Sequence, residues 1–141
     1  MKTTYPANIV WSDEDKVFEV SFIDLPGCIT FGATLEEAKT MASDALTGVL
    51  ESMIDRNIDL PTASTAQGRG SSLIEPAHSV SFALWLRTRR KASGMTLTDI
   101  ADKLGVKYQV YQKLEDPAKT NPTLKTLAKI EKVFGERIVM I

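Results

Sequence analysis

A stretch rich in Ser, Thr, Gly and Ala separates two regions of regular hydrophobic patterning. It reads NIDLPTASTAQGRGSSLIEPAH, from Asn57 to His78, and shows no helical period, which is typical of a linker. A chain of 141 residues interrupted in this way is expected to form two small domains, each burying its own core. We place the boundary after residue 77, which gives domains over 1–77 and 78–141 and a linker over 57–77.

The two halves carry opposite charge. Residues 1–78 hold 5 Lys and Arg against 12 Asp and Glu, a net charge of −7, whereas residues 79–141 hold 12 against 6, a net charge of +6. A basic half favours a polyanionic partner, while an acidic half favours a basic protein partner or simply solubility.

Cysteine content and hydropathy exclude several classes of protein. The single Cys28 cannot form an internal disulfide, and one Cys with one His cannot supply a four-ligand zinc site. No apolar run approaches the length of a membrane span, and no apolar segment follows the lysine of MKTTYPAN. We therefore expect a cytoplasmic protein with no metal site, no cofactor and no membrane contact.

The first half has the pattern of a small antiparallel sheet followed by a helix. Apolar and polar residues alternate over Tyr5–Trp11 and Phe18–Phe22, and the polar SDEDK between them predicts a hairpin. CITFG supplies a third strand after the LPG turn, and SLIEP is a candidate fourth strand. Thr34 and Glu37 form a capping-box pattern ahead of a helical apolar period. The predicted fold class is α+β, with a three- to four-stranded antiparallel sheet and one helix.

The stretch DLPGCITFGAT, from Asp24 to Thr34, combines a carboxylate, a turn and a lone thiol, and so has the appearance of an active site. Pro26 and Gly27 are suited to a turn, and Cys28 to packing at the start of a strand. No histidine or cation stands near Cys28 to activate it as a nucleophile. We read Asp24 and the acids of SDEDK as solvated turn residues, and predict no catalytic residue.

The second half has the spacing of a helix-turn-helix. VSFALWLRTRRKASG predicts a helix with a basic end, and Gly94 suits its C-cap. Thr96 and Asp99 then cap LTDIADKL, and Gly105 turns the chain into KYQVYQKLE. A last helix, LKTLAKIEKVF, ends at Gly135, and the apolar tail ERIVMI suits a closing strand or a dimer contact. We predict an all-α domain.

The second of the two short helices has a polar side suited to reading DNA. We expect Val110, Tyr111 and Leu114 on its packed face. A glutamine amide can pair with adenine, a lysine can reach guanine or phosphate, and a tyrosine can contact a thymine methyl or a phosphate. The predicted DNA-reading residues on the opposite face are Tyr108, Gln109, Gln112 and Lys113.

The segment MTLTDIADKLGVKYQVYQKLEDPAKTNPTLKTLAKIEKVFG resembles the phage-repressor helix-turn-helix of the Cro/C1 class. Repressors of that class commonly carry a phosphate-anchoring glutamine where this chain has Leu97. We therefore expect Thr96, Thr98 and Lys107 to supply phosphate contacts instead. The class also implies recognition of a palindromic operator, and thus a homodimer or a dimer of dimers.

The segment VFEVSFIDLPGCITFGATLEEAKTMASDALTGVLESMIDRNIDLPTAS resembles the HicB antitoxins, whose hallmarks are a DLPGC turn, an EEA…AL helix and a PxPS-like end. That resemblance implies a partial ribonuclease H-like fold, inhibition of a small basic mRNA-cleaving toxin of the HicA type, and repression of the protein's own operon. It also places Asp24, Leu25 and Pro26 at the rim of a toxin-binding surface.

Two other functions are compatible with parts of the sequence. One is a stand-alone helix-turn-helix regulator with an N-terminal ligand-binding or dimerisation domain. The other is a nuclease, which would need several carboxylates on neighbouring strands around Mg²⁺, whereas the predicted strand interiors offer only Glu19. The residues thus favour a protein that is not an enzyme.

Overall fold

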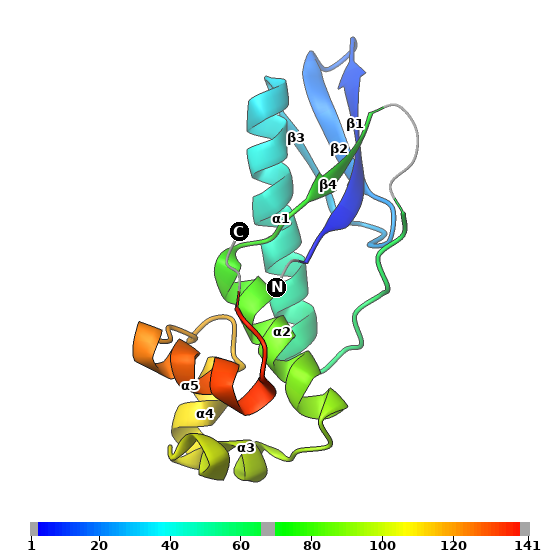
Figure 1. The fold of residues 1–141 in the computed structure, drawn as a ribbon. Helices are drawn as coiled ribbons and strands as arrows, with labels where there is room; N and C mark the ends of the chain where they lie inside the picture. The colour runs from blue at the N-terminus through cyan, green and yellow to red at the C-terminus, as the bar shows by residue number, and fades with distance from the viewer. Residues whose placement is uncertain (1–2, 66–69, 139–141) are drawn as a thin grey trace. The chain divides into compact units, whose positions relative to one another are not determined.

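The computed structural model describes residues 3–65 and 70–138 and divides the chain into two compact units (Figure 1). Residues 3–77 form the first unit and the helices from His78 onward form the second. The first unit contains β1 (Tyr5–Ser12), β2 (Val17–Phe22), β3 (Ile29–Gly32), α1 (Leu35–Asp55) and β4 (Ser71–Ile74). The second contains α2 (His78–Ala92), α3 (Leu97–Leu104), α4 (Tyr108–Leu114) and α5 (Leu124–Phe134).

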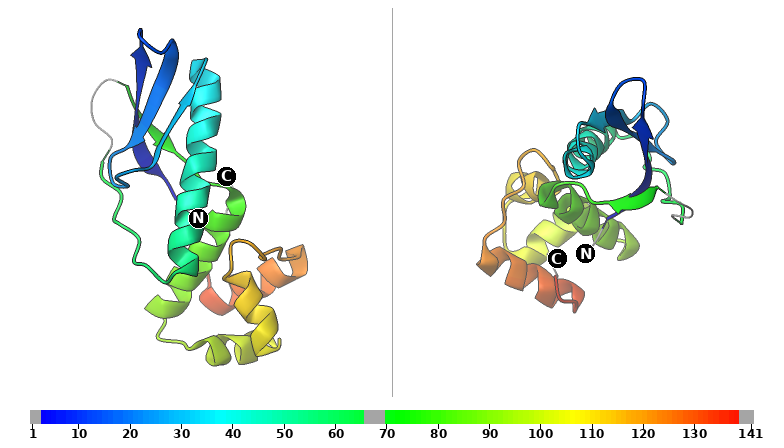
Figure 2. Two further views of the ribbon diagram at one scale, coloured as in Figure 1. Left: turned by 180° about the vertical axis from the view of Figure 1, so that it is seen from behind. Right: turned by 90° about the horizontal axis from the view of Figure 1, so that it is seen from above.

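The four strands form one antiparallel sheet in the order β3-β2-β1-β4. The predicted hairpin, third strand and candidate fourth strand are all confirmed. Ile9 pairs with Val20 and Ala7 with Phe22, and these four side chains are buried on the face that α1 covers (Figure 2). The strand alternation therefore defines one core-facing side of the sheet.

Helix α1 begins at the predicted N-cap. The Thr34 hydroxyl accepts a hydrogen bond from the backbone N–H of Glu37 at 3.1 Å, while the Glu37 carboxylate accepts from Ala33 rather than from Thr34 itself. The small side chains of Ala38 and Ala42 are fully buried and allow the helix to approach the sheet closely. A Cβ on Gly32 would lie 2.3 Å from the backbone nitrogen of Ala38, so only glycine fits at the end of β3.

The helical unit packs around one hydrophobic core. Its buried members come from all four helices and are Phe82, Leu86, Ile100, Ala101, Leu104, Tyr111, Leu114 and Ile130. Trp85 and Phe134 add an edge-to-face contact between α2 and α5, with ring centroids 5.9 Å apart. Gly105 ends α3 in the left-handed region at φ 70°, as the predicted turn requires.

Two expectations for this unit are corrected. Val110 is 49% exposed and does not belong to the packed face, because the core side of α4 is defined by Tyr111 and Leu114, one turn apart. The tail ERIVMI has no strand over residues 136–138, where Ile138 packs partly against the core instead. Residues 139–141 of the tail lie outside the described part of the chain.

Candidate DNA-binding and partner-binding sites

The predicted DNA-reading residues share one exposed side of α4. Tyr108, Gln109, Gln112 and Lys113 are all exposed, whereas Tyr111 and Leu114 face the core. With a turn of 3.6 residues, Gln109, Gln112 and Lys113 lie at the centre of this side, and Tyr108 and Val110 flank it. The structure therefore brings two amides and an ammonium together on the exposed side of an α-helix, an element that the major groove of DNA can admit.

The residues expected to contact phosphate differ in their local roles. Thr96 caps α3 and accepts from Asp99 N–H at 3.1 Å, while the Asp99 carboxylate accepts from Thr96 N–H at 2.9 Å. The hydrogen bond that the Thr96 backbone N–H donates to this carboxylate, and after it the Thr96 side chain, hold the pKa of Asp99 below its usual value. Thr98 is exposed on α3, and Leu97 packs against the helical core.

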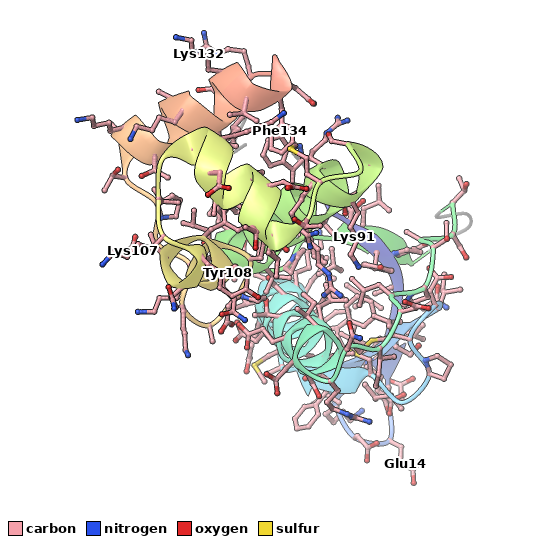
Figure 3. All side chains as sticks on the ribbon, turned by 90° about the horizontal axis from the view of Figure 1, so that it is seen from below. Glu14, Lys91, Lys107, Tyr108, Lys132 and Phe134 are labelled. Carbon is pink, nitrogen blue, oxygen red and sulfur yellow. The ribbon has the colours of Figure 1, made fainter. Side chains whose placement is uncertain are left out.

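Lys107 stands immediately before α4 and is exposed. It occupies the N-cap position but makes no side-chain capping bond, as expected for a side chain that has only donors (Figure 3). An exposed ammonium at the start of α4 is suitably placed to contact a phosphate beside the groove.

The basic end of α2 is used within the fold. Arg90 donates from Nε and Nη2 to the carboxylate oxygens of Glu115 at 2.6 and 3.0 Å, and from Nη1 to the carbonyl of Met95 at 3.1 Å. The hydrogen bonds that Arg90 donates to Glu115 raise the pKa of Arg90. Arg89 pairs with Glu136 at 2.7 Å. From the sequence, these arginines were expected only to interact favourably with the helix dipole. Partners so distant along the chain leave no local pattern that could reveal the ion pairs.

The DLPGC turn is bonded to the segment that follows α1. Asp24 accepts hydrogen bonds from the backbone N–H of Ser64 at 2.8 Å and from the Ser64 hydroxyl. Close by in the chain, the Tyr5 hydroxyl donates to the carbonyl of Pro61 at 2.7 Å, and burial together with Asp24 raises the pKa of Tyr5. The two motifs that carried the HicB resemblance in the first half are therefore joined to each other in space.

The remaining residues of that turn divide between core and surface. Leu25 and Cys28 are each 5% exposed, and burial raises the pKa of the Cys28 thiol, which disfavours the reactive thiolate. Gly27 has φ 88°, and Cys28 N–H donates to the carbonyl of Leu25 at 3.0 Å, as in a type II turn. Asp24 and Leu25 thus serve the fold itself, and Pro26 is the predicted rim residue whose side chain is exposed.

Sequence reasoning missed an apolar surface on the sheet. Val10, Ile29 and Phe31 point away from α1 and are 58%, 69% and 61% exposed. Alternation usually marks one apolar side of a strand, yet β3 places isoleucine and phenylalanine on its outward side. In ITFG, Ile29 and Phe31 lie on one side of the strand and Thr30 and Gly32 on the other. This alternation is the signal that could have revealed the surface.

The described residues contain no group of three or more His, Cys, Asp and Glu side chains arranged to hold a metal ion. Within the same part of the chain, no helix has the length and apolar character needed to cross a bilayer.

The chain shares its two-part organisation with known proteins. Residues 4–77 match the family described as HicB_like antitoxin of bacterial toxin-antitoxin system, and residues 86–140 match a helix-turn-helix family. Antitoxin HicB 1 of Photorhabdus laumondii is 27% identical over 136 residues, covering 96% of this chain and 84% of that protein. Antitoxin HicB 2 of the same organism is 24% identical over 137 residues, covering 97% and 94%.

Two solved structures are also similar. The Burkholderia pseudomallei antitoxin HicB has a TM-score of 0.44 and 24% identity, over 53% of this chain and 62% of that one. A toxin-antitoxin complex from Streptococcus pneumoniae has a TM-score of 0.49 and 22% identity, over 73% of this chain and 99% of that one. With the first family covering more than half of its residues and a helix-turn-helix after it, the chain belongs to the HicB-like antitoxins of bacterial toxin-antitoxin systems.

Proposed function

We propose that this antitoxin binds and inhibits a small HicA-type mRNA-cleaving toxin and represses its own operon by sequence-specific DNA binding. The observation that carries the proposal is the union, in one chain, of a HicB-like unit and a helix-turn-helix whose exposed side presents Gln109, Gln112 and Lys113. Neither role requires catalysis, and we propose that the protein acts in the cytoplasm without being an enzyme.

The opposite charges of the two units support toxin binding by the first unit and DNA binding by the second. A net charge of −7 over residues 1–78 is complementary to a basic, RNA-binding toxin, and complementary charge accelerates association. A net charge of +6 over residues 79–141 favours binding to the phosphate backbone of DNA. We propose that the turn of Asp24, Leu25 and Pro26, in which Pro26 is exposed, lies at the rim of the toxin-binding surface.

Operator recognition is proposed to need more than one copy of the chain. One recognition helix reads only a few base pairs, and a two-fold dimer reads two half-sites about one DNA turn apart. We propose a homodimer or a dimer of dimers as the DNA-binding species, with Thr96, Thr98 and Lys107 contacting phosphates and Tyr108, Gln109, Gln112 and Lys113 facing the bases.

Native mass spectrometry tests the toxin arm directly. The full chain is co-expressed with the small reading frame that flanks its gene. A stable heteromer with a basic partner of fewer than about a hundred residues, the size of a small single domain, supports the proposal. A homo-oligomer alone contradicts it and favours instead a self-contained transcriptional regulator whose first unit binds a ligand or dimerises.

A further inference from the structure

The outward side of the sheet is apolar where β1, β2 and β3 lie side by side. Val10 pairs across the sheet with Glu19, and Glu19 in turn pairs with Phe31. Ile29 lies two residues before Phe31 on the same side. These side chains surround a hollow with a volume of about 540 Å³, lined among others by Val10, Asp15, Val17, Glu19, Ile29 and Phe31.

This surface is costly to leave in water. Helix α1 covers the opposite side of the sheet (Figure 2), and no described segment of the first unit, residues 3–65 and 70–77, shields Val10, Ile29 or Phe31, which stay more than half exposed. Contiguous exposed apolar side chains bordered by polar ones are typical of protein interaction sites. An aromatic residue at the centre of such a patch is a common source of binding energy.

The hollow is acidic as well as apolar. Asp15 and Glu19 line it, and neither carboxylate forms an ion pair with another residue of the described chain. Nearby, Asp13 lies 3.8 Å from the exposed Lys16 and accepts a hydrogen bond from Trp11 Nε1 at 2.9 Å, and Glu14 projects from the tip of the β1–β2 turn (Figure 3). A second copy of the chain docking here through its own first unit would bring like charges together, whereas a basic partner would meet complementary ones.

We propose that the outward side of the sheet, where Asp15 and Glu19 line the same hollow as Ile29 and Phe31, is the docking surface for a basic protein that inserts apolar side chains into the hollow. The inference rests on the proposed function, because it identifies this basic partner with the toxin. It assigns the main contact to β1, β2 and β3 rather than to the turn at Asp24, Leu25 and Pro26.

Two substitutions in the full-length chain test the surface. Phe31→Ser removes the central apolar anchor, and Glu19→Lys reverses the charge between Val10 and Phe31. The matched controls lie at exposed positions on α1, on the opposite side of the sheet. Met41→Ser likewise replaces an apolar side chain by serine, and Asp44→Lys likewise replaces a carboxylate by an ammonium. The probe is the product of the small reading frame flanking the gene, and the readouts are heteromer formation and Kd at two salt concentrations.

Phe31→Ser is expected to weaken binding by about tenfold or more, as loss of an interface anchor does. Glu19→Lys is expected to slow association, most strongly at low salt, as loss of charge steering does. Both controls are expected to bind within about twofold of the wild-type chain, since substitutions outside an interface leave its contacts intact. Thermal unfolding of each variant verifies the fold, and because Phe31 and Glu19 are exposed, their replacement is expected to leave Tm nearly unchanged.

Three outcomes overturn the inference. If the wild-type chain forms a heteromer and both test variants form it with unchanged Kd, this surface is not the docking site, but the proposed function still stands. A wild-type chain that forms no heteromer removes the inference and the proposed toxin binding together. Self-association that is lost in Phe31→Ser identifies a second copy of the chain as the occupant, contrary to the proposal.

Discussion

Arg90 holds Glu115 through two hydrogen bonds, from Nε at 2.6 Å and from Nη2 at 3.0 Å, and so joins the last turn of α2 to the residue that ends α4. The side chains are only 12% and 9% exposed. Burial and then Glu115 raise the pKa of Tyr111, whose ring fills the core beneath α4. The orientation of α4 therefore depends on an ion pair as well as on apolar packing.

Removing Glu115 is expected to destabilise the helical unit. Glu115→Ala leaves the largely buried Arg90 cation without its partner, which is expected to lower the free energy of unfolding by about 3 kcal/mol. Urea denaturation followed by circular dichroism measures the change. Glu136→Ala is the control, because it breaks the more exposed Arg89 pair and is expected to cost less than about 1 kcal/mol. Equal losses in the two variants would contradict a special role for the Arg90 pair.

Gln109 and Gln112 are expected to determine sequence preference. Gln109→Ala or Gln112→Ala is expected to weaken binding to the promoter DNA of the chain's own operon by about 1–3 kcal/mol each, the value of a bidentate contact to adenine. Fluorescence anisotropy compares this DNA with a scrambled duplex, on which the same variants are expected to bind like the wild type. Lys107→Ala offers the contrast, because its exposed ammonium is proposed to contact phosphate and its loss is expected to weaken binding to both duplexes. An equal loss on both duplexes for the glutamine variants would refute base reading.

The capping box of α3 is expected to make stability depend on pH. The carboxylate of Asp99 has a lowered pKa in the folded chain, so its contribution to stability is present above the ordinary aspartate pKa of about 3.9 and is lost as pH falls through the lower folded value. The destabilisation caused by Asp99→Ala should therefore shrink on acidification. Thr123→Ala, at the N-cap of α5, is the control. It removes a hydroxyl cap with no carboxylate partner, and its cost of about 1 kcal/mol is expected to stay constant over the same pH range, as measured by denaturation at each pH. A pH-independent cost of Asp99→Ala would contradict this account.

Local patterns predicted the elements well because each has a local physical cause. The alternation of β1 and β2, the cap at Thr34, the turn at Gly105 and the N-cap at Thr96 all involve residues close together in the chain, and the structure confirms them. The sequence did not reveal what depends on distant partners. The bonds from Asp24 to Ser64 and from Arg90 to Glu115 join segments separated by 40 and 25 residues.

The error at Val110 has a related cause. A helix as short as α4 offers too few apolar residues for periodicity to fix its packed face, which tertiary contacts of Tyr111 and Leu114 decide. The outward apolar residues of β3 escaped prediction for a different reason. Ile29 and Phe31 alternate with Thr30 and Gly32 as the core side of a strand would, and only the pairing of β3 with β2 decides which side faces α1.

The close approach of α1 to β3 makes the sharpest prediction about stability. A methyl group at Gly32 would meet the backbone of Ala38 at 2.3 Å, so Gly32→Ala must displace the start of α1 and is expected to cost about 1–3 kcal/mol, as overpacking does. Gly48→Ala is the matched control: it adds the same methyl group inside α1, where nothing lies within 4 Å, and is expected to stabilise the chain by about 0.5–1 kcal/mol through helix propensity. Thermal unfolding of the two variants should therefore shift Tm in opposite directions. A shift in the same direction would show that the contact between β3 and α1 is looser than the distance implies.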